Sequence, residues 1–99
     1  MVKRVKKMSV PRDSGENETN EMMRETIFEA IRIQVRTNDP PETAMTLERL
    51  RAQGLSEEEA MKLVGCALSV EIFEIMTKGR TFDPDRYRTN LERLPELPF

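Results

Sequence analysis

Two carboxylates stand among apolar side chains in the second half of the chain, and their type and position could support chemistry. On a helical wheel of about 100° per residue, Glu71 falls about 20° from Ala60 and from Val64. Glu74 lies near a second apolar direction of the same segment. A buried carboxylate without a partner is costly in free energy or takes up a proton. We therefore expect both side chains to be paired.

Possible partners for these carboxylates come from other parts of the chain. Gln34 lies close to an apolar direction of its own helix and is a third candidate for a buried polar residue. The candidate partners are Gln34, Arg24, Arg80 and Tyr87. One interpretation is a buried ion pair or hydrogen-bonded network that fixes the register of the helices. The alternative is a carboxylate site that uses Glu71 and Glu74 to hold a divalent metal or to act as an enzyme.

The residue types that the sequence lacks weaken the catalytic alternative. The chain has no histidine and a single cysteine, Cys66, so neither a Ser-His or Cys-His pair nor an intramolecular disulfide can form. Helical bundles hold di-iron centres with inward Glu residues, but that pattern adds a Glu-x-x-His motif. Cys66 stands among apolar residues, where a thiol behaves as a small hydrophobe. We therefore predict the buried network, with no catalytic residue, no metal ligand and no cofactor.

Four helices are expected to position these residues. Apolar residues recur at helical spacing in each segment, and no segment alternates as a strand would. Two prolines after Asp39 end the first helix, and Gly54 with a capping box from Ser56 to Glu59 separates the second from the third. The expected ranges are about 20–37, 41–53, 57–78 and 84–94. The fold class is therefore all-α, a small four-helix bundle-like domain over residues 21–95 with a short tail at 96–99.

The third of these segments, residues 57–78, is apolar on nearly every side. A helix with that pattern is a buried one, yet about eighty residues can hardly surround it completely. Small chains often gain the missing stability by self-association. We therefore predict a homodimer or another homo-oligomer. The interface candidates are Val70, Ile72, Phe73 and Met76 on this segment, with Met22 and Ile33 on a second edge of the first helix.

Charge divides the chain into a basic beginning and an acidic remainder. Residues 1–12 carry five basic and no acidic residues, whereas residues 13–99 carry eleven basic and eighteen acidic ones. Residues 1–20 lack a convincing apolar period, so we predict a disordered basic tail. Such a tail can contact the phosphates of nucleic acid. It is short and has no interleaved aromatic residue, which favours a solvated terminus over a nucleic-acid contact.

The sequence predicts a cytoplasmic location. The apolar core of a secretory signal is missing after the basic stretch. No stretch approaches the roughly 18 consecutive apolar residues of a membrane-spanning helix. A single cysteine gives no sign of an oxidising compartment. We therefore expect no contact with a membrane.

Several short motifs together resemble a family of bacterial helical proteins, the domain-of-unknown-function 1841 type. They are Asn38-Asp39-Pro40-Pro41-Glu42, Leu47-Glu48-Arg49-Leu50 followed by Gly54, Glu59-Ala60, and Phe82-Asp83 with Tyr87. The resemblance covers about residues 27–95 and implies a cytoplasmic bacterial all-helical protein of unknown activity. Members carry histidines in the first helix and near the start of the third, and this chain has none. A metal or catalytic role that depends on those histidines therefore does not transfer.

The combined pattern predicts a non-enzymatic module that associates with itself and binds or regulates other proteins. The motivating feature is the excess of apolar surface on residues 57–78. A partner protein of another kind is a further possibility for the same surface. The carboxylate site of Glu71 and Glu74 and the nucleic-acid contact of the basic tail remain as alternatives.

Overall fold

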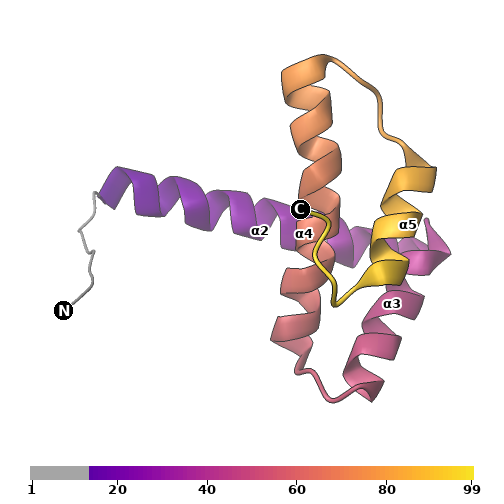
Figure 1. The fold of residues 1–99 in the computed structure, drawn as a ribbon. Coiled ribbons are helices and arrows are strands. Elements are labelled where there is room, and N and C mark those ends of the chain that lie inside the picture. Colours follow the sequence, from indigo (N-terminus) through magenta and orange to yellow (C-terminus); the bar gives the residue numbers. More distant parts are fainter. Residues whose placement is uncertain (1–13) are drawn as a thin grey trace.

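The computed structural model describes the backbone of residues 14–99 and the side chains of residues 21–99. Within this part the chain forms four helices that contact one another, which confirms the all-α class (Figure 1). They are α2 (Ser14–Thr37), α3 (Pro41–Ala52), α4 (Glu57–Lys78) and α5 (Pro84–Arg93). The basic stretch at residues 1–12 lies outside the described residues, so the predicted tail is described only over residues 14–20.

Both ends of α4 lie where the sequence predicts them. The Ser56 hydroxyl accepts a hydrogen bond from the Glu59 amide, and the Glu59 carboxylate accepts one from the Ser56 amide. This reciprocal capping box satisfies two amides that the first turn leaves without helical partners. At the other end Gly79 has a φ of 65°, a left-handed conformation that glycine adopts without strain. The predicted range of residues 57–78 is therefore confirmed.

The helix α2 begins at Ser14, whereas the sequence predicts a start near Asn20. No proline occurs between Ser14 and Asp39, and acidic residues near a helix start interact favourably with its dipole. The helix therefore continues through a segment that lacks an apolar stripe. The helical part of the chain begins before residue 21, the expected domain boundary, and residues 14–20 are helical.

The helices α3 and α5 begin at the predicted residues and end one residue before the predicted ends. Pro41 and Pro84 each occupy the first turn, where a missing amide hydrogen costs nothing. The Asp83 carboxylate caps α5 by accepting hydrogen bonds from the amides of Asp85 and Arg86, at 3.1 Å in both cases. Hydrogen bonds from α3 stabilise the C-terminal end of α5, because the Arg49 guanidinium donates to the carbonyl oxygens of Leu91 and Leu94.

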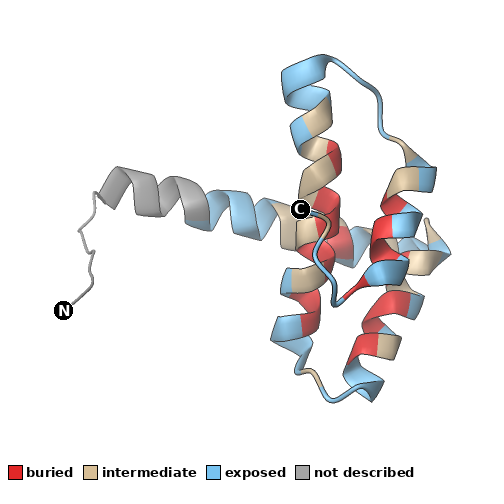
Figure 2. Cartoon of the chain, in the orientation of Figure 1, coloured by how far each residue is buried: buried red, intermediate tan, exposed pale blue. Residues whose placement is uncertain are grey.

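The helix α4 is the central element of the fold. It contacts α2, α3 and α5, and its buried residues face these three helices (Figure 2). In Figure 1, α2 crosses α4 and its N-terminal half projects beyond the other helices. This crossing departs from the aligned helices that the term bundle implies. The core consists of Ile31, Leu47, Leu50, Ala60, Met61, Val64, Ala67, Leu68, Tyr87, Leu91 and Leu94.

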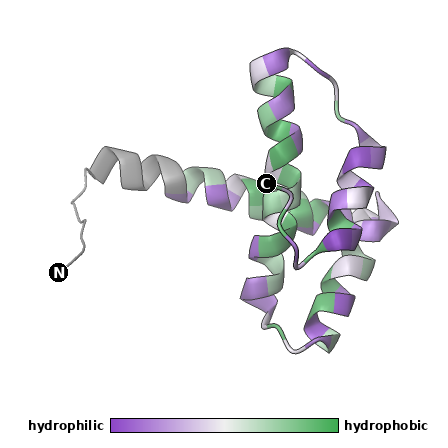
Figure 3. Cartoon of the chain, viewed as in Figure 1, coloured by the Kyte–Doolittle hydropathy of each residue, from purple (hydrophilic) through white to green (hydrophobic). Residues whose placement is uncertain are grey.

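The apolar character of α4 continues past the region that the other helices cover. In Figure 3, residues coloured green, the hydrophobic end of the scale, recur along most of the length of α4. Toward the C-terminal end, however, Phe73, Ile75 and Met76 are exposed. Within residues 14–99 no helix combines the length and the apolar character that crossing a bilayer requires.

Candidate functional site

The carboxylate of Glu71 is fully buried and fully engaged. Its side chain has no exposed surface, and its Oε2 accepts a hydrogen bond from Nε of Arg86 at 2.6 Å. Its Oε1 accepts from Nη2 of Arg86 at 3.1 Å and from the backbone amide of Asp83 at 2.8 Å. These three bonds join α4 to the start of α5. The hydrogen bonds to Glu71 are the main cause of a raised pKa at Arg86.

The prediction that Glu71 is buried and paired is therefore confirmed, but its partner is not among the candidates Gln34, Arg24, Arg80 and Tyr87. The partner is Arg86, which sequence reasoning missed. Arg86 directly precedes Tyr87, the start of the buried stripe of α5, so it lies at the edge of that stripe. A long basic side chain at such an edge can reach inward, and that position was the available signal.

Gln34, predicted to be buried, is only partly buried and belongs to a second network, which joins α2, α3 and α5. Its Oε1 accepts hydrogen bonds from the hydroxyls of Thr43, at 2.7 Å, and Tyr87, at 2.9 Å. The two hydroxyls are 3.4 Å apart. Burial raises the pKa of the Tyr87 phenol, and its hydrogen bonds to Thr43 and Gln34 offset part of that effect. Gln34 is thus a network residue that contacts neither Glu71 nor Glu74 by a hydrogen bond.

Glu74 lies near the C-terminal end of α4, and its side chain is 14% exposed. Its Oε2 lies 3.2 Å from Nζ of Lys78, and its Oε1 lies 3.7 Å from Nη1 of Arg80. Arg80 is therefore a partner of Glu74 and not of Glu71, while Arg24 lies 3.7 Å from Glu21 on the surface of α2. The two carboxylates have separate sets of partners and do not form one site.

The described residues offer little for a metal or for nucleophilic chemistry. In residues 21–99 no group of three or more His, Cys, Asp or Glu side chains is arranged to hold a metal ion. Both oxygens of Glu71 already accept hydrogen bonds. Burial raises the pKa of the Cys66 thiol, which disfavours the reactive thiolate. The geometry around Glu71 is that of an ion pair that fixes the position of α5 against α4.

An exposed apolar groove lies between the middle of α2 and the C-terminal half of α4. We call it the α2–α4 groove, and its volume is about 640 Å³. It is lined by Met23, Ile27, Ser69, Val70, Ile72, Phe73, Met76, Thr77, Pro98 and Phe99. Four of the six predicted interface residues, Val70, Ile72, Phe73 and Met76, therefore lie together in one groove. The C-terminal tail, which sequence reasoning left unplaced, supplies one wall through Pro98 and Phe99.

The other two predicted interface residues lie outside this groove. Met22 is 69% exposed and sits in a shallow surface depression beside Glu21 and Glu25. Ile33 is 42% exposed in a neighbouring depression, which shares Glu25 and Thr26 with that of Met22. The structure does not bring Met22 and Ile33 together with the α4 residues. Met22 and Ile33 therefore lie about three turns apart along one edge of α2, as predicted, and this edge is separate from the α2–α4 groove.

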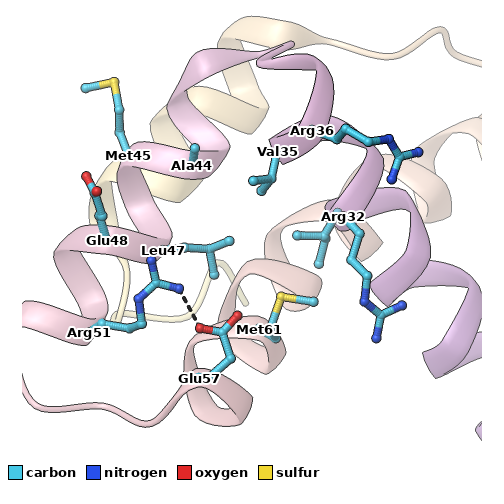
Figure 4. Close-up of a pocket in the computed structure, with 11 residues that line it drawn as sticks. Arg32, Val35, Arg36, Ala44, Met45, Leu47, Glu48, Arg51, Glu57 and Met61 are labelled. Carbon is cyan, nitrogen blue, oxygen red and sulfur yellow. Dashed lines mark hydrogen bonds and ion pairs between the residues drawn. The ribbon is translucent and has the colours of Figure 1, made fainter.

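A second groove lies between the C-terminal half of α2 and the pair α3 and α4 (Figure 4). Its floor is the closed core, since Ile31, Leu47 and Met61 are nearly fully buried. Its walls carry charged side chains: Arg32 and Arg36 from α2, Glu48 and Arg51 from α3, and Glu57 from α4. Figure 4 shows the ion pair between Arg51 and Glu57 across this groove. The groove therefore exposes less apolar surface than the α2–α4 groove.

Comparisons with known protein families, with curated proteins and with solved structures find no match to this chain. The resemblance to the domain-of-unknown-function 1841 type stays a prediction. The residues that carry it serve mainly as helix boundaries in the structure, as Asp39 and Asp83 illustrate.

Proposed function

We propose that this protein is a non-enzymatic helical module that associates with itself through the α2–α4 groove. The observation that carries the proposal is the concentration of exposed apolar side chains there. Phe73, Met76 and Phe99 are 58%, 75% and 79% exposed. Monomeric proteins rarely leave a contiguous apolar patch uncovered, and such patches mark interaction sites. A regulatory role would follow if association controlled access to a further partner.

The buried polar residues support a structural role better than a catalytic one. Glu71 and Gln34 are surrounded by donors from the same chain, which fix α5 and α3 in place. A catalytic carboxylate needs an open approach for a substrate or a proton. The α2–α4 groove, in contrast, is open and has almost no charged lining, as expected for a protein contact.

Sedimentation of the full chain over a range of concentrations tests the proposal. We expect reversible dimers or higher oligomers for the natural sequence. Phe73→Glu should weaken association at least about tenfold. The substitution replaces an aromatic side chain of the proposed interface with a charge that association must desolvate. Circular dichroism of the same samples checks that the helices are intact.

A matched control variant is Met45→Glu. Met45 is 63% exposed, so the substitution is similar in size and charge but lies on the wall of the other groove. It should leave the association constant within about twofold of the natural value. A natural chain that stays monomeric at high micromolar concentration, or equal effects of the two substitutions, would refute the proposal.

A further inference from the structure

The N-terminal half of α2 lies outside the globule that the other helices form. Every side chain from Glu21 to Thr26 is exposed, including Met22 and Met23 at 69% and 52%. In Figure 1 this part of the helix extends away from α3, α4 and α5. Helical segments shorter than about 12–15 residues are marginal in water without packing. Over residues 21–26, the part of the projecting half whose side chains are described, α2 therefore has little of the packing that normally stabilises such a segment.

The α2–α4 groove opens at the base of the same segment. Met23 and Ile27 line it together with Phe73 and Met76 of α4. The chain thus has an uncovered apolar groove beside a projecting helix that carries two exposed methionines, Met22 and Met23. A helix whose apolar side chains enter an apolar groove is a recurrent form of protein recognition.

We propose that two copies of the chain exchange these features, so that the projecting half of α2 from each copy lies in the α2–α4 groove of the other. This inference rests on the proposed self-association and names the element that forms the interface. A two-fold axis makes the two contacts equivalent, and the assembly closes as a dimer. One arrangement then covers Phe73 and Met76 of both copies and packs both projecting helices.

Charge supports the same pairing. On the projecting part of α2, residues 21–26 carry two acidic residues, Glu21 and Glu25, and one basic residue, Arg24. At the end of α4, Lys78 and Arg80 share one carboxylate, that of Glu74. An acidic helix therefore meets a groove with a basic end. Such complementarity orients the two copies and raises the rate of association.

The second groove is a poorer receptor for the same helix. Its floor residues are already covered, with Ile31, Leu47 and Met61 exposed by 0%, 4% and 7%. A helix placed there would cover fewer exposed apolar side chains, chiefly Val35 and Met45. It would also have to displace the charged walls, including the ion pair of Arg51 with Glu57. The observations therefore favour the α2–α4 groove.

Disulfide cross-linking between two differently tagged chains tests the exchange. Both chains carry Cys66→Ala to remove the single natural thiol. One also carries Met22→Cys on the projecting helix, and the other carries Met76→Cys at the groove. After mixing and mild oxidation, we expect the mixed disulfide on a non-reducing gel at several times the yield of a control pair. The control pair combines Met22→Cys with Met45→Cys at the other groove.

The possible outcomes separate this inference from the proposed function. Equal yields for the two pairs would overturn the exchange. If Met76→Cys chains link to each other while Met22→Cys chains do not, the grooves pack face to face, and self-association stands without the exchange. If no pair links and sedimentation also shows monomers, both proposals fail, and the groove then serves a partner of another kind.

Discussion

Glu71 is a buried carboxylate whose oxygens accept hydrogen bonds from protein groups in place of water. The guanidinium of Arg86 and the backbone amide of Asp83 donate hydrogen bonds to its two oxygens, at distances between 2.6 and 3.1 Å. Such a pair is not automatically stabilising, because desolvation opposes the attraction between the charges. Its clearer effect is geometric, since an incorrectly placed α5 would leave a carboxylate buried without partners. We interpret the pair as the device that sets the position of α5.

Substitutions at this pair should have unequal effects. Glu71→Gln leaves a guanidinium that is 28% exposed and can reach water, and we expect a loss of about 2 kcal/mol in the free energy of unfolding. Arg86→Met leaves a fully buried carboxylate without its charge partner and should be more destabilising. The double variant Glu71→Met with Arg86→Met should recover much of the loss.

Urea unfolding of the three variants, followed by circular dichroism, measures this order. A larger loss for Glu71→Gln than for Arg86→Met would contradict the interpretation. So would a Glu71→Gln protein that keeps its full stability but loses a metal-dependent or enzymatic activity. That second result would revive the carboxylate alternative.

Tyr87 is the single tyrosine of the chain, and the chain has no tryptophan, so its ionisation can be followed directly. Burial raises the pKa of its phenol above the ordinary value of 10.0. The unfolded chain therefore releases this proton at a lower pH than the folded chain does. It follows that the contribution of Tyr87 to stability is complete below about pH 10 and declines as the pH rises further.

Two titrations check this prediction. The phenolate absorbance of the folded protein should appear at a higher pH than that of the urea-unfolded protein. The free energy of unfolding should fall at alkaline pH in the natural chain, and Tyr87→Phe should show a shallower fall. Identical phenolate titrations for the folded and unfolded protein would show that the ring is accessible to water.

At the scale of elements, the close crossing of α2 and α4 depends on a glycine. A Cβ placed on Gly65 would lie 3.3 Å from Cγ2 of Ile27 and 3.9 Å from Cε1 of Phe28. A larger residue inside α4 has a better helix propensity than glycine, by up to about 1 kcal/mol. Here the preference for a larger residue conflicts with packing. The absence of a side chain at Gly65 allows α2 to lie directly against α4.

Gly65 therefore offers a graded test of the crossing. Gly65→Ala should change stability little, because its helix propensity compensates for one tight contact. Gly65→Leu should lower the free energy of unfolding by about 1–3 kcal/mol, the usual cost of overpacking. Thermal melts followed by circular dichroism measure both. Equal stability of the Leu and Ala variants would show that α2 can shift away from α4 at no cost.

At the scale of the whole molecule, folding and association should be coupled. A domain of this size buries only a little over 60% of its unfolded surface, and its margin of stability is small. Covering Phe73, Met76 and Phe99 with a second copy would add apolar burial that the single chain lacks. The projecting half of α2 would gain its packing in the same step.

The melting temperature should consequently depend on protein concentration. We expect Tm of the natural chain to rise by a few degrees between low and high micromolar concentration, because association stabilises the folded state by mass action. The Phe73→Glu chain should melt at one temperature throughout this range. Scanning calorimetry at several concentrations measures both, and a constant Tm for the natural chain would argue against coupling.

Local signals in the sequence were sufficient for the helices. The capping box at Ser56, the glycine at position 79 and the prolines at 41 and 84 act within one turn of the boundaries they set, so reading them needed no knowledge of the fold. The start of α2 was the exception, since helix continues through residues 14–20 without an apolar stripe to indicate it. Apolar periodicity indicates packing against other elements, and the side chains described at the start of α2, from Glu21 to Thr26, are all exposed.

Long-range contacts required the tertiary structure. The sequence by itself determined that the fold is helical, that α4 is its centre and that Glu71 is buried and paired. Only the structure decided that the partner is Arg86, that Gln34 joins Thr43 and Tyr87, and that the C-terminal tail lines the groove. The physical reason is that a helical wheel gives the direction of a side chain around its own axis. It gives no information on the angle at which two helices cross, and that angle selects which distant residues meet.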